Sequence, residues 1–212
     1  MADPIVYGPG YSTYVRTARL ALEEKAVAYK LEEFDFIQGG MPPEQLARQP
    51  FGKVPAFEHD GFALYETDAI TRYVDEAFPG PALQPDGARD RARMNQILSI
   101  LGSYTYAPTV GALVIQRLVV PMAGGEPDEA MIDKALPEVD KCMQVLEGLL
   151  GTHAYFVNDK LSLADLHLIP IYAYFCMTPE SAGILEKTPG LRQWWDGISA
   201  RDSVEATQPQ LG

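Results

Sequence analysis

Apolar residues recur with two different periods in the first third of the chain. Ile5-Val6-Tyr7 is a short apolar run followed by Gly8-Pro9-Gly10, which predicts a buried strand and then a loop. The next apolar residues have helical spacing, so we expect a helix that begins after Ser12 or Thr13. The apolar face of this helix consists of Val15, Ala18 and Leu22.

The pattern then predicts three more strands and a second helix. Residues 29–36 are rich in aromatic side chains and predict a strand, whereas the glycines and prolines of residues 37–50 predict a loop with at most a short helix. Residues 54–57 and 62–65 predict a hairpin with Asp60-Gly61 in its turn. The apolar face of the helix that follows consists of Ile70, Tyr73, Val74 and Ala77.

These elements predict an α+β thioredoxin-like N-terminal domain over residues 1–77, followed by an all-α C-terminal domain. Residues 78–87 contain three prolines and two glycines, which is typical of a linker. Residues 88–212 show helical periodicity and no strand pattern. The helical segments are residues 88–120, 128–150, 162–176 and 189–200. Three prolines are expected to bend or end helices there: Pro108, Pro121 and Pro170.

The charge of the chain argues against a nucleic-acid partner. The 17 basic and 29 acidic residues give a formal charge of −12. Residues 1–77 carry 7 basic and 13 acidic residues, and the remainder carries 10 and 16, so each part contributes −6. Nucleic-acid binding normally requires a basic surface, which neither part supplies. An acidic, well-solvated surface is the expected result.

Cysteine and histidine usage indicates a reducing compartment and no metal site. Cys142 and Cys176 are far apart, and no CxxC motif is present. The three histidines, His59, His153 and His167, lack metal-ligand spacing. The sequence shows no signal peptide and no apolar stretch of the ~18 residues that suggest a membrane span. We therefore expect a soluble cytoplasmic protein without a membrane partner.

Hydroxyl side chains stand where the first strand gives way to the first helix, at Ser12 and Thr13. A helix N-terminus presents unpaired N–H groups and partial positive charge, which stabilise an anion such as a thiolate. Arg16 and Arg19 either add positive potential there or form surface ion pairs. The alternative is that Ser12 or Thr13 only caps the helix.

Two further segments are suited to hold a peptide-like ligand. Val54 precedes Pro55 and is therefore biased towards an extended conformation, so its N–H and C=O can pair with an added strand, especially if the bond is cis. Thr67 is expected to cap the next helix, whose first N–H groups can bind a carboxylate, while Glu66 can accept from an ammonium group. The alternatives are a plain strand start and a plain helix cap.

A capping box of the form S-x-x-D precedes an apolar helix in the C-terminal domain. It consists of Ser162-Leu163-Ala164-Asp165. The serine and the aspartate of such a box satisfy each other's backbone N–H groups. We expect its role to be structural.

In their order and spacing these segments resemble the cytosolic glutathione S-transferases over nearly the whole chain. The likeness is strongest to the serine-type enzymes, especially the phi class and its bacterial relatives. It is carried by residues 7–13, 22–25, 50–55, 66–73 and 162–165. The resemblance implies a glutathione transferase that joins the glutathione thiolate to hydrophobic electrophiles, with no cofactor beyond the co-substrate glutathione.

The resemblance also implies roles for particular residues. Ser12 would be catalytic and donate a hydrogen bond to the glutathione sulfur; Tyr7 is the alternative catalyst, although it lies inside the strand. Val54 would pair with the cysteinyl part. The glutathione-binding residues would be Ser12, Met41, Lys53, Val54, Pro55, Glu66 and Thr67. Gly40-Met41 stands where phi enzymes commonly have His-Lys, and Lys53 stands where they often have Gln.

The second substrate and the assembly follow from the same resemblance. The hydrophobic co-substrate pocket would include Tyr11, Tyr106, Val110 and Leu113. The family forms homodimers, so a homodimer is expected. A non-catalytic ligand-binding or carrier protein on the same fold is the alternative function. A glutathione-dependent thiol reductase is disfavoured, because it normally has a cysteine near position 12.

Overall fold

The computed structural model describes residues 2–35 and 40–209. The chain forms two compact units. The first consists of Met1–Gln84 together with Ala200–Gly212, and the second is Pro85–Ser199. This division differs from the expected one at the C-terminus, because the last residues belong to the first unit and not to the helical one.

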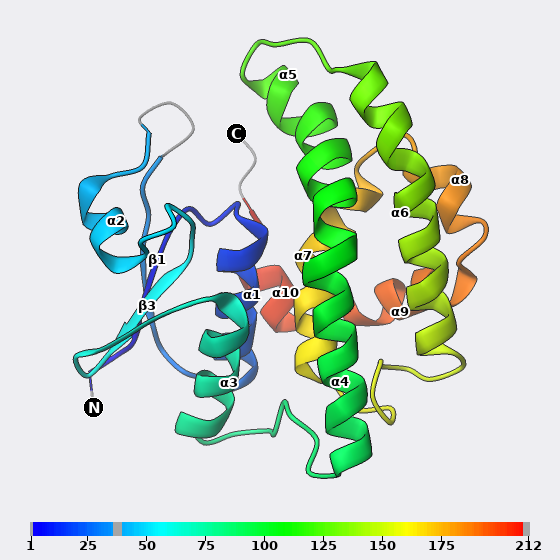
Figure 1. Ribbon diagram of the computed structural model, residues 1–212. Coiled ribbons are helices and arrows are strands. Elements are labelled where there is room, and N and C mark those ends of the chain that lie inside the picture. Colours follow the sequence, from blue (N-terminus) through cyan, green and yellow to red (C-terminus); the bar gives the residue numbers. More distant parts are fainter. Residues whose placement is uncertain (1, 36–39, 210–212) are drawn as a thin grey trace. The chain divides into compact units, whose positions relative to one another are not determined.

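The first unit is a four-stranded mixed sheet with helices on both faces. Its strands are β1 (Ile5–Tyr7), β2 (Lys30–Glu32), β3 (Ala56–His59) and β4 (Phe62–Tyr65), in the order β2-β1-β3-β4. β1 is parallel to β2 and antiparallel to β3, which pairs antiparallel with β4. The helices α1 (Thr13–Glu24) and α3 (Thr67–Ala77) pack together on one face, and α2 (Pro43–Arg48) lies on the other (Figure 1). The predicted thioredoxin-like order is confirmed.

The strand limits differ from the prediction in two places. β2 ends at Glu32, whereas the aromatic run predicted a strand over 29–36; residue 36 lies outside the described part of the chain. β3 begins at Ala56 and not at Val54, since Pro55 has no N–H for the ladder. The predicted hairpin turn is confirmed: Asp60 and Gly61 both have positive φ, +49° and +78°, as a two-residue turn of this hand requires.

The helix α10 (Asp202–Ala206) lies beside α1 and completes the first unit (Figure 1). The Glu24 carboxylate accepts bonds of 2.8 and 2.6 Å from the Arg201 guanidinium. The guanidinium of Arg16, which is only 2% exposed, donates to Val204 O at 3.3 Å. Arg16 is therefore a buried cation of α1. This excludes the surface ion pair, which was one of the two predicted possibilities for this residue.

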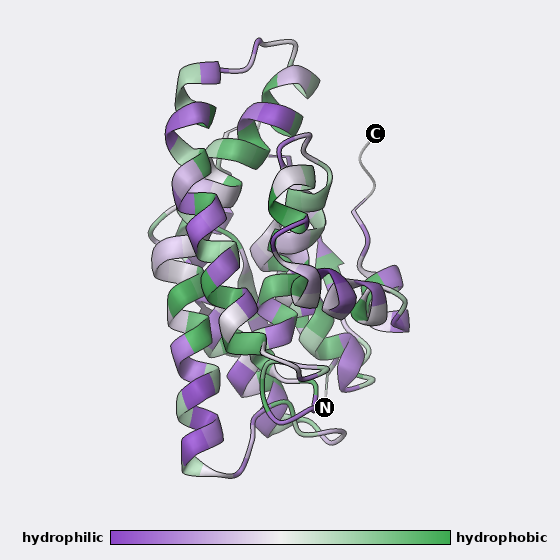
Figure 2. Cartoon of the chain, turned by 90° about the vertical axis from the view of Figure 1, so that its right-hand side faces the viewer, coloured by the Kyte–Doolittle hydropathy of each residue, from purple (hydrophilic) through white to green (hydrophobic). Residues whose placement is uncertain are grey.

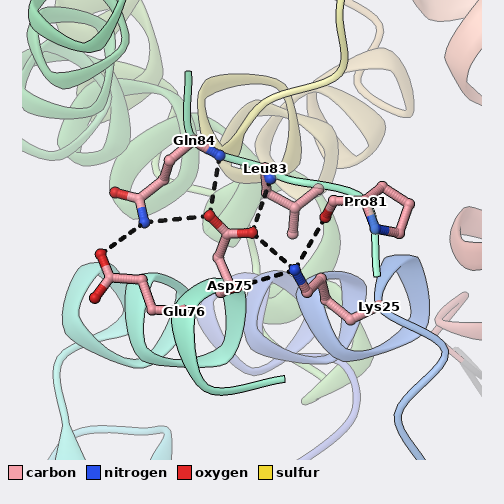
Figure 3. A network of polar contacts seen from close by, with 6 residues as sticks. All are labelled: Lys25, Asp75, Glu76, Pro81, Leu83 and Gln84. Carbon is pink, nitrogen blue, oxygen red and sulfur yellow. Dashed lines mark hydrogen bonds and ion pairs between the residues drawn. The ribbon is translucent and has the colours of Figure 1, made fainter. Parts of the chain in front are cut away.

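A buried ion pair ties the segment after α3 to α3 itself and to the C-terminal end of α1 (Figure 3). Lys25 Nζ lies 3.1 Å from Asp75 Oδ1, and the two side chains are 3% and 6% exposed. The Asp75 carboxylate also accepts from the N–H groups of Leu83 and Gln84 at 2.8 and 3.1 Å, and Lys25 Nζ donates to Pro81 O at 3.0 Å. The proline-rich segment is thus held by defined bonds although it contains neither helix nor strand.

The second unit begins with a long bent helical rod. It comprises α4 (Ala88–Ile100), the π-helices η1 (Leu101–Thr105) and η2 (Ala107–Val119), and α5 (Val120–Met122). The two arms, Ala88–Thr105 and Ala107–Met122, meet at 50°. The bend coincides with the π-helical turns and with Pro108, and both features are established causes of helix kinks. The bend predicted at Pro108 is confirmed.

Four more helices complete the second unit: α6 (Glu129–Leu150), α7 (Leu163–Cys176), α8 (Ser181–Leu185) and α9 (Pro189–Ile198). α7 is buried over most of its length and forms the core, and Pro170 does not end it. Hydrophilic and hydrophobic residues alternate along the outer helices (Figure 2). No single helix of the described ranges is long and apolar enough to cross a membrane, and the bent rod reaches that length and composition only when its two arms are counted together.

Candidate active site

The loop between β1 and α1 packs directly against the loop that precedes β3. Gly8 has φ +139°, and a Cβ atom there would lie 2.7 Å from Val15 Cγ2 and 3.0 Å from Val54 Cβ. Only glycine permits this approach. Two predicted site segments, the start of α1 and Val54-Pro55, are therefore brought together.

Ser12 is the N-cap of α1, as predicted. Its φ and ψ are −65° and 130°, and its Oγ accepts from Val15 N at 3.5 Å, which is a long bond. The first turn of α1 contains no acidic side chain. Ser12 is half-buried, and its hydroxyl donates no hydrogen bond to any described residue. An O–H donor at a helix N-terminus therefore remains available to an incoming anion.

Thr13 and Tyr7 are less suitable as donors to such an anion. Thr13 is buried in the first turn of α1. The Tyr7 hydroxyl donates to Glu58 Oε2 at 3.4 Å, and its ring lies 4.0 Å below the Arg48 guanidinium. Burial, and then the charge of Glu58, raise the pKa of Tyr7. Ser12 is thus more exposed than Thr13, and unlike Tyr7 it does not use its hydroxyl as a donor within the described residues.

The Val54–Pro55 bond is cis. The backbone of Lys53, which precedes Val54, is hydrogen-bonded by two glutamine side chains at α2. Gln45 Nε2 donates to Lys53 O at 2.9 Å, and Lys53 N donates to Gln49 Oε1 at 3.0 Å. Both glutamines are buried. Among the described residues no partner uses the Val54 N–H or C=O, so both can pair with an added extended chain.

Sequence reasoning missed Gln45 and Gln49, which hold the backbone next to the predicted binding segment. Gln45 lies in α2 and Gln49 is its extended C-cap, so no helical spacing relates the two, and the sequence pattern carried no signal for the pair. Lys53 itself has an exposed side chain, and Met41 is half-buried before α2.

The pairing of β3 with β4 places the start of α3 beside the loop that precedes β3. Ala56 pairs with Tyr65, so Glu66 follows the end of β4 next to the residues that precede β3. Glu66, and not Thr67 as predicted, is the N-cap of α3; Thr67 is its first helical residue and is 7% exposed. Glu66 has φ +71°, which is uncommon for a side chain other than glycine and often marks a functional position. The Glu66 side chain makes no capping hydrogen bond to the first turn of α3.

The predicted pocket residues belong to both units. Tyr11 is in the first unit, and burial followed by the charges of Asp35 and Glu33 raises its pKa. In the second unit Tyr106 is half-buried and Val110 is nearly buried, whereas Leu113 is completely buried. Leu113 therefore packs in the helical core in this structure.

Comparison with known proteins gives consistent results over both units. Family models described as glutathione S-transferase, N-terminal domain, and glutathione S-transferase, C-terminal domain, match residues 6–82 and 94–202. Glutathione S-transferase 4 of Zea mays is 35% identical over 208 residues, which cover 96% of this chain and 92% of that protein. A crystal structure of glutathione transferase F2 from Populus trichocarpa has a TM-score of 0.87 at 30% identity, with 96% of each chain covered. A structure of glutathione S-transferase-I bound with lactoylglutathione has a TM-score of 0.86 at 29% identity, covering 97% of this chain and 98% of that one.

Proposed function

The chain belongs to the glutathione S-transferase family, and from that premise we propose that its Ser12 hydroxyl stabilises the glutathione thiolate for attack on an electrophilic carbon. The protein is a glutathione transferase, as its phi-like resemblance predicted. The observation that carries the proposed role of Ser12 is its unengaged O–H donor at the N-terminus of α1. A donor in that position favours a sulfur anion over a neutral thiol.

Glutathione is an extended tripeptide, and the three loops of the first unit match its parts. We assign the backbone of Val54, before the cis Pro55, to the cysteinyl residue, because its N–H and C=O are available for strand-like pairing. Glu66 and Thr67 are assigned to the γ-glutamyl end, where the start of α3 binds the carboxylate and Glu66 the ammonium group. Lys53 and Met41 are assigned to the glycyl end.

The chemistry needs only a modest stabilisation of the anion. A free thiol has a pKa of about 8.5, and lowering it by about two units requires about 2.7 kcal/mol. A hydrogen bond to a charged group contributes about 1.5–3 kcal/mol. The helix N-terminus adds about 0.3–1 kcal/mol. One serine hydroxyl at a helix end therefore accounts for the shift without itself losing a proton.

In the reaction the sulfur lone pair forms a bond to the electrophilic carbon, and a leaving group such as chloride departs with the electrons of its own bond. The product is a thioether. We assign Tyr106 and Val110 of the second unit to the apolar co-substrate, and for Tyr11 of the first unit this role stays a prediction of the resemblance.

We further infer a homodimer in the cytoplasm that uses no cofactor beyond glutathione. Phe51, beside the glutathione-binding loop, is 71% exposed, and a large apolar side chain in that state favours a protein interface. Cys142 and Cys176 are both free thiols, which fits a reducing compartment.

Replacement of Ser12 tests the central assignment. Ser12→Ala should lower kcat with a chlorinated nitroarene about 100-fold, the effect of losing one well-placed donor. It should still bind glutathione, as calorimetry can measure. Thr13→Val is the matched control and should retain turnover. Unchanged turnover in Ser12→Ala removes Ser12 from the mechanism, and no heat from glutathione with the unmodified protein contradicts the binding site.

A further inference from the structure

The loop that carries Ser12 is held by a carboxylate that lies just beyond the end of β2. The Gly10 N–H donates a hydrogen bond of 2.7 Å to Glu33 Oε1, 23 positions along the chain. A bond from a backbone N–H to an ionised carboxylate is shorter and about twice as strong as a neutral one. The contact therefore fixes the middle of the loop to the neighbouring strand.

The absence of a side chain at position 10 is what allows this contact. A Cβ atom on Gly10 would lie 2.9 Å from Glu33 Oε1 and 3.4 Å from Arg19 Nη1. A methyl group there would displace the carboxylate. A side chain at position 10 would therefore act by moving the Glu33 carboxylate and not by straining the backbone, because the φ of Gly10 lies outside the left-handed region.

Ser12 is two residues further along the same turn. Its N–H donates to Pro9 O at 3.0 Å, which closes the turn around Gly10. We propose that Glu33 is a positioning residue for the Ser12 hydroxyl, because its carboxylate fixes the turn from which Ser12 enters α1. This inference rests on the proposed role of Ser12.

The same carboxylate places negative charge near the proposed thiolate. Tyr11, which stands between Gly10 and Ser12, has a raised pKa, caused first by burial and then by Asp35 and Glu33. A cation also approaches this position, since Arg19 Nη1 would lie 3.4 Å from a Cβ atom on Gly10. Glu33 thus favours the thiolate by positioning the Ser12 hydroxyl and disfavours it by its own negative charge. Substitutions can separate these two effects.

Three variants and one control make that separation. Gly10→Ala breaks the bond and keeps the charge, Glu33→Gln keeps an oxygen acceptor and removes the charge, and Glu33→Ala removes both. Glu32→Gln is the matched control, since the adjacent carboxylate pairs with Lys30 and does not contact the loop.

The first measurement uses the protein without glutathione. Hydrogen exchange of the peptide that covers residues 8–14 should be about tenfold faster in Gly10→Ala and Glu33→Ala, the effect expected for loss of one charge-assisted bond. Glu33→Gln, which replaces the charge-assisted bond by a neutral one, should lie between Glu33→Ala and the unmodified protein, and Glu32→Gln should match the unmodified protein. Equal exchange in Glu33→Ala and Glu32→Gln overturns the proposal, whether or not glutathione binds.

The second measurement follows the bound thiol. In Gly10→Ala and Glu33→Ala, kcat should fall about tenfold while the glutathione Kd changes less than about threefold, because a displaced hydroxyl acts on the reacting sulfur and not on the tripeptide backbone. Ultraviolet titration of bound glutathione should give a higher thiol pKa in Gly10→Ala and a lower one in Glu33→Gln. If Glu33 had only a structural role, these two substitutions would not shift the thiol pKa in opposite directions. The same thiol pKa in both contradicts the assignment, whereas failure of the unmodified protein to bind glutathione contradicts only the proposed function.

Discussion

Two of the described helices have a serine N-cap, and the two caps differ in burial and in their hydrogen bonds. Ser162 begins α7, is buried, and forms a capping box with Asp165. Ser12 begins α1, is half-buried, and has no carboxylate three residues on. The first cap is closed by the chain itself, and the second leaves its donor for a ligand.

In the closed cap, at Ser162, the carboxylate of Asp165 accepts four hydrogen bonds. Asp165 is completely buried and accepts from Ser162 N and Oγ at 2.9 Å each, from Phe156 N at 3.1 Å and from Trp194 Nε1 at 3.0 Å. One carboxylate thus joins the start of α7, the preceding loop and α9. The comparison teaches that a serine N-cap stabilises the fold where its hydrogen bonds are satisfied, whereas a serine N-cap with an unused donor is suited to bind an anion.

The largest expected effect is on stability and comes from breaking the closed cap. Asp165→Ala leaves four buried donors without their acceptor, so we expect the free energy of unfolding to fall by about 3–5 kcal/mol. Urea denaturation at pH 7 measures it. Asp133→Ala, at an exposed position on α6, is the control and should change stability by less than about 0.5 kcal/mol. A loss below about 1 kcal/mol in Asp165→Ala would show that water replaces the carboxylate.

The closed cap should also give a pH dependence that the open cap lacks. Burial raises the pKa of Asp165 to about 6 against the opposing donors. Between the unfolded pKa and this value the folded state binds more protons, so stability falls as pH rises from about 4 to 6, by about 3 kcal/mol. The difference in unfolding free energy between the unmodified protein and Asp165→Asn should show this slope. A difference that rises with pH in that window would mean that the donors outweigh burial.

The smallest effect compares the two serines directly. Ser162→Ala removes a buried cap and should cost about 1–2 kcal/mol of stability. Ser12→Ala should cost less than about 0.5 kcal/mol, because the Oγ accepts only at 3.5 Å. Thermal unfolding of both variants tests the pair. Equal losses would mean that Ser12 is a structural cap after all.

Local patterns predicted a large part of this structure. The buried face of α1, the hairpin turn at Asp60-Gly61 and the capping box at Ser162 each depend on residues close together in the chain, so spacing and turn chemistry were enough. The same holds for Ser12, whose position at the start of α1 follows from the strand–loop–helix order.

The contacts that the sequence did not reveal connect distant segments. Glu33 reaches Gly10 from the end of β2, and Gln45 and Gln49 reach the backbone of Lys53. Nothing in the periodicity around these polar residues distinguishes them from solvated ones, because their partners are set by how the elements pack. The same reason explains why the buried state of Arg16 was left open.

The attachment of α10 to α1 has a consequence during synthesis. Residues 85–199 lie between the two parts of the first unit along the chain, so a ribosome completes this unit only after it has made the whole second unit. A product terminated after Ser199 would lack Val204 O, which Arg16 contacts, and Arg201, the partner of Glu24. Termination after Ser199 therefore removes contacts from the unit whose synthesis began first.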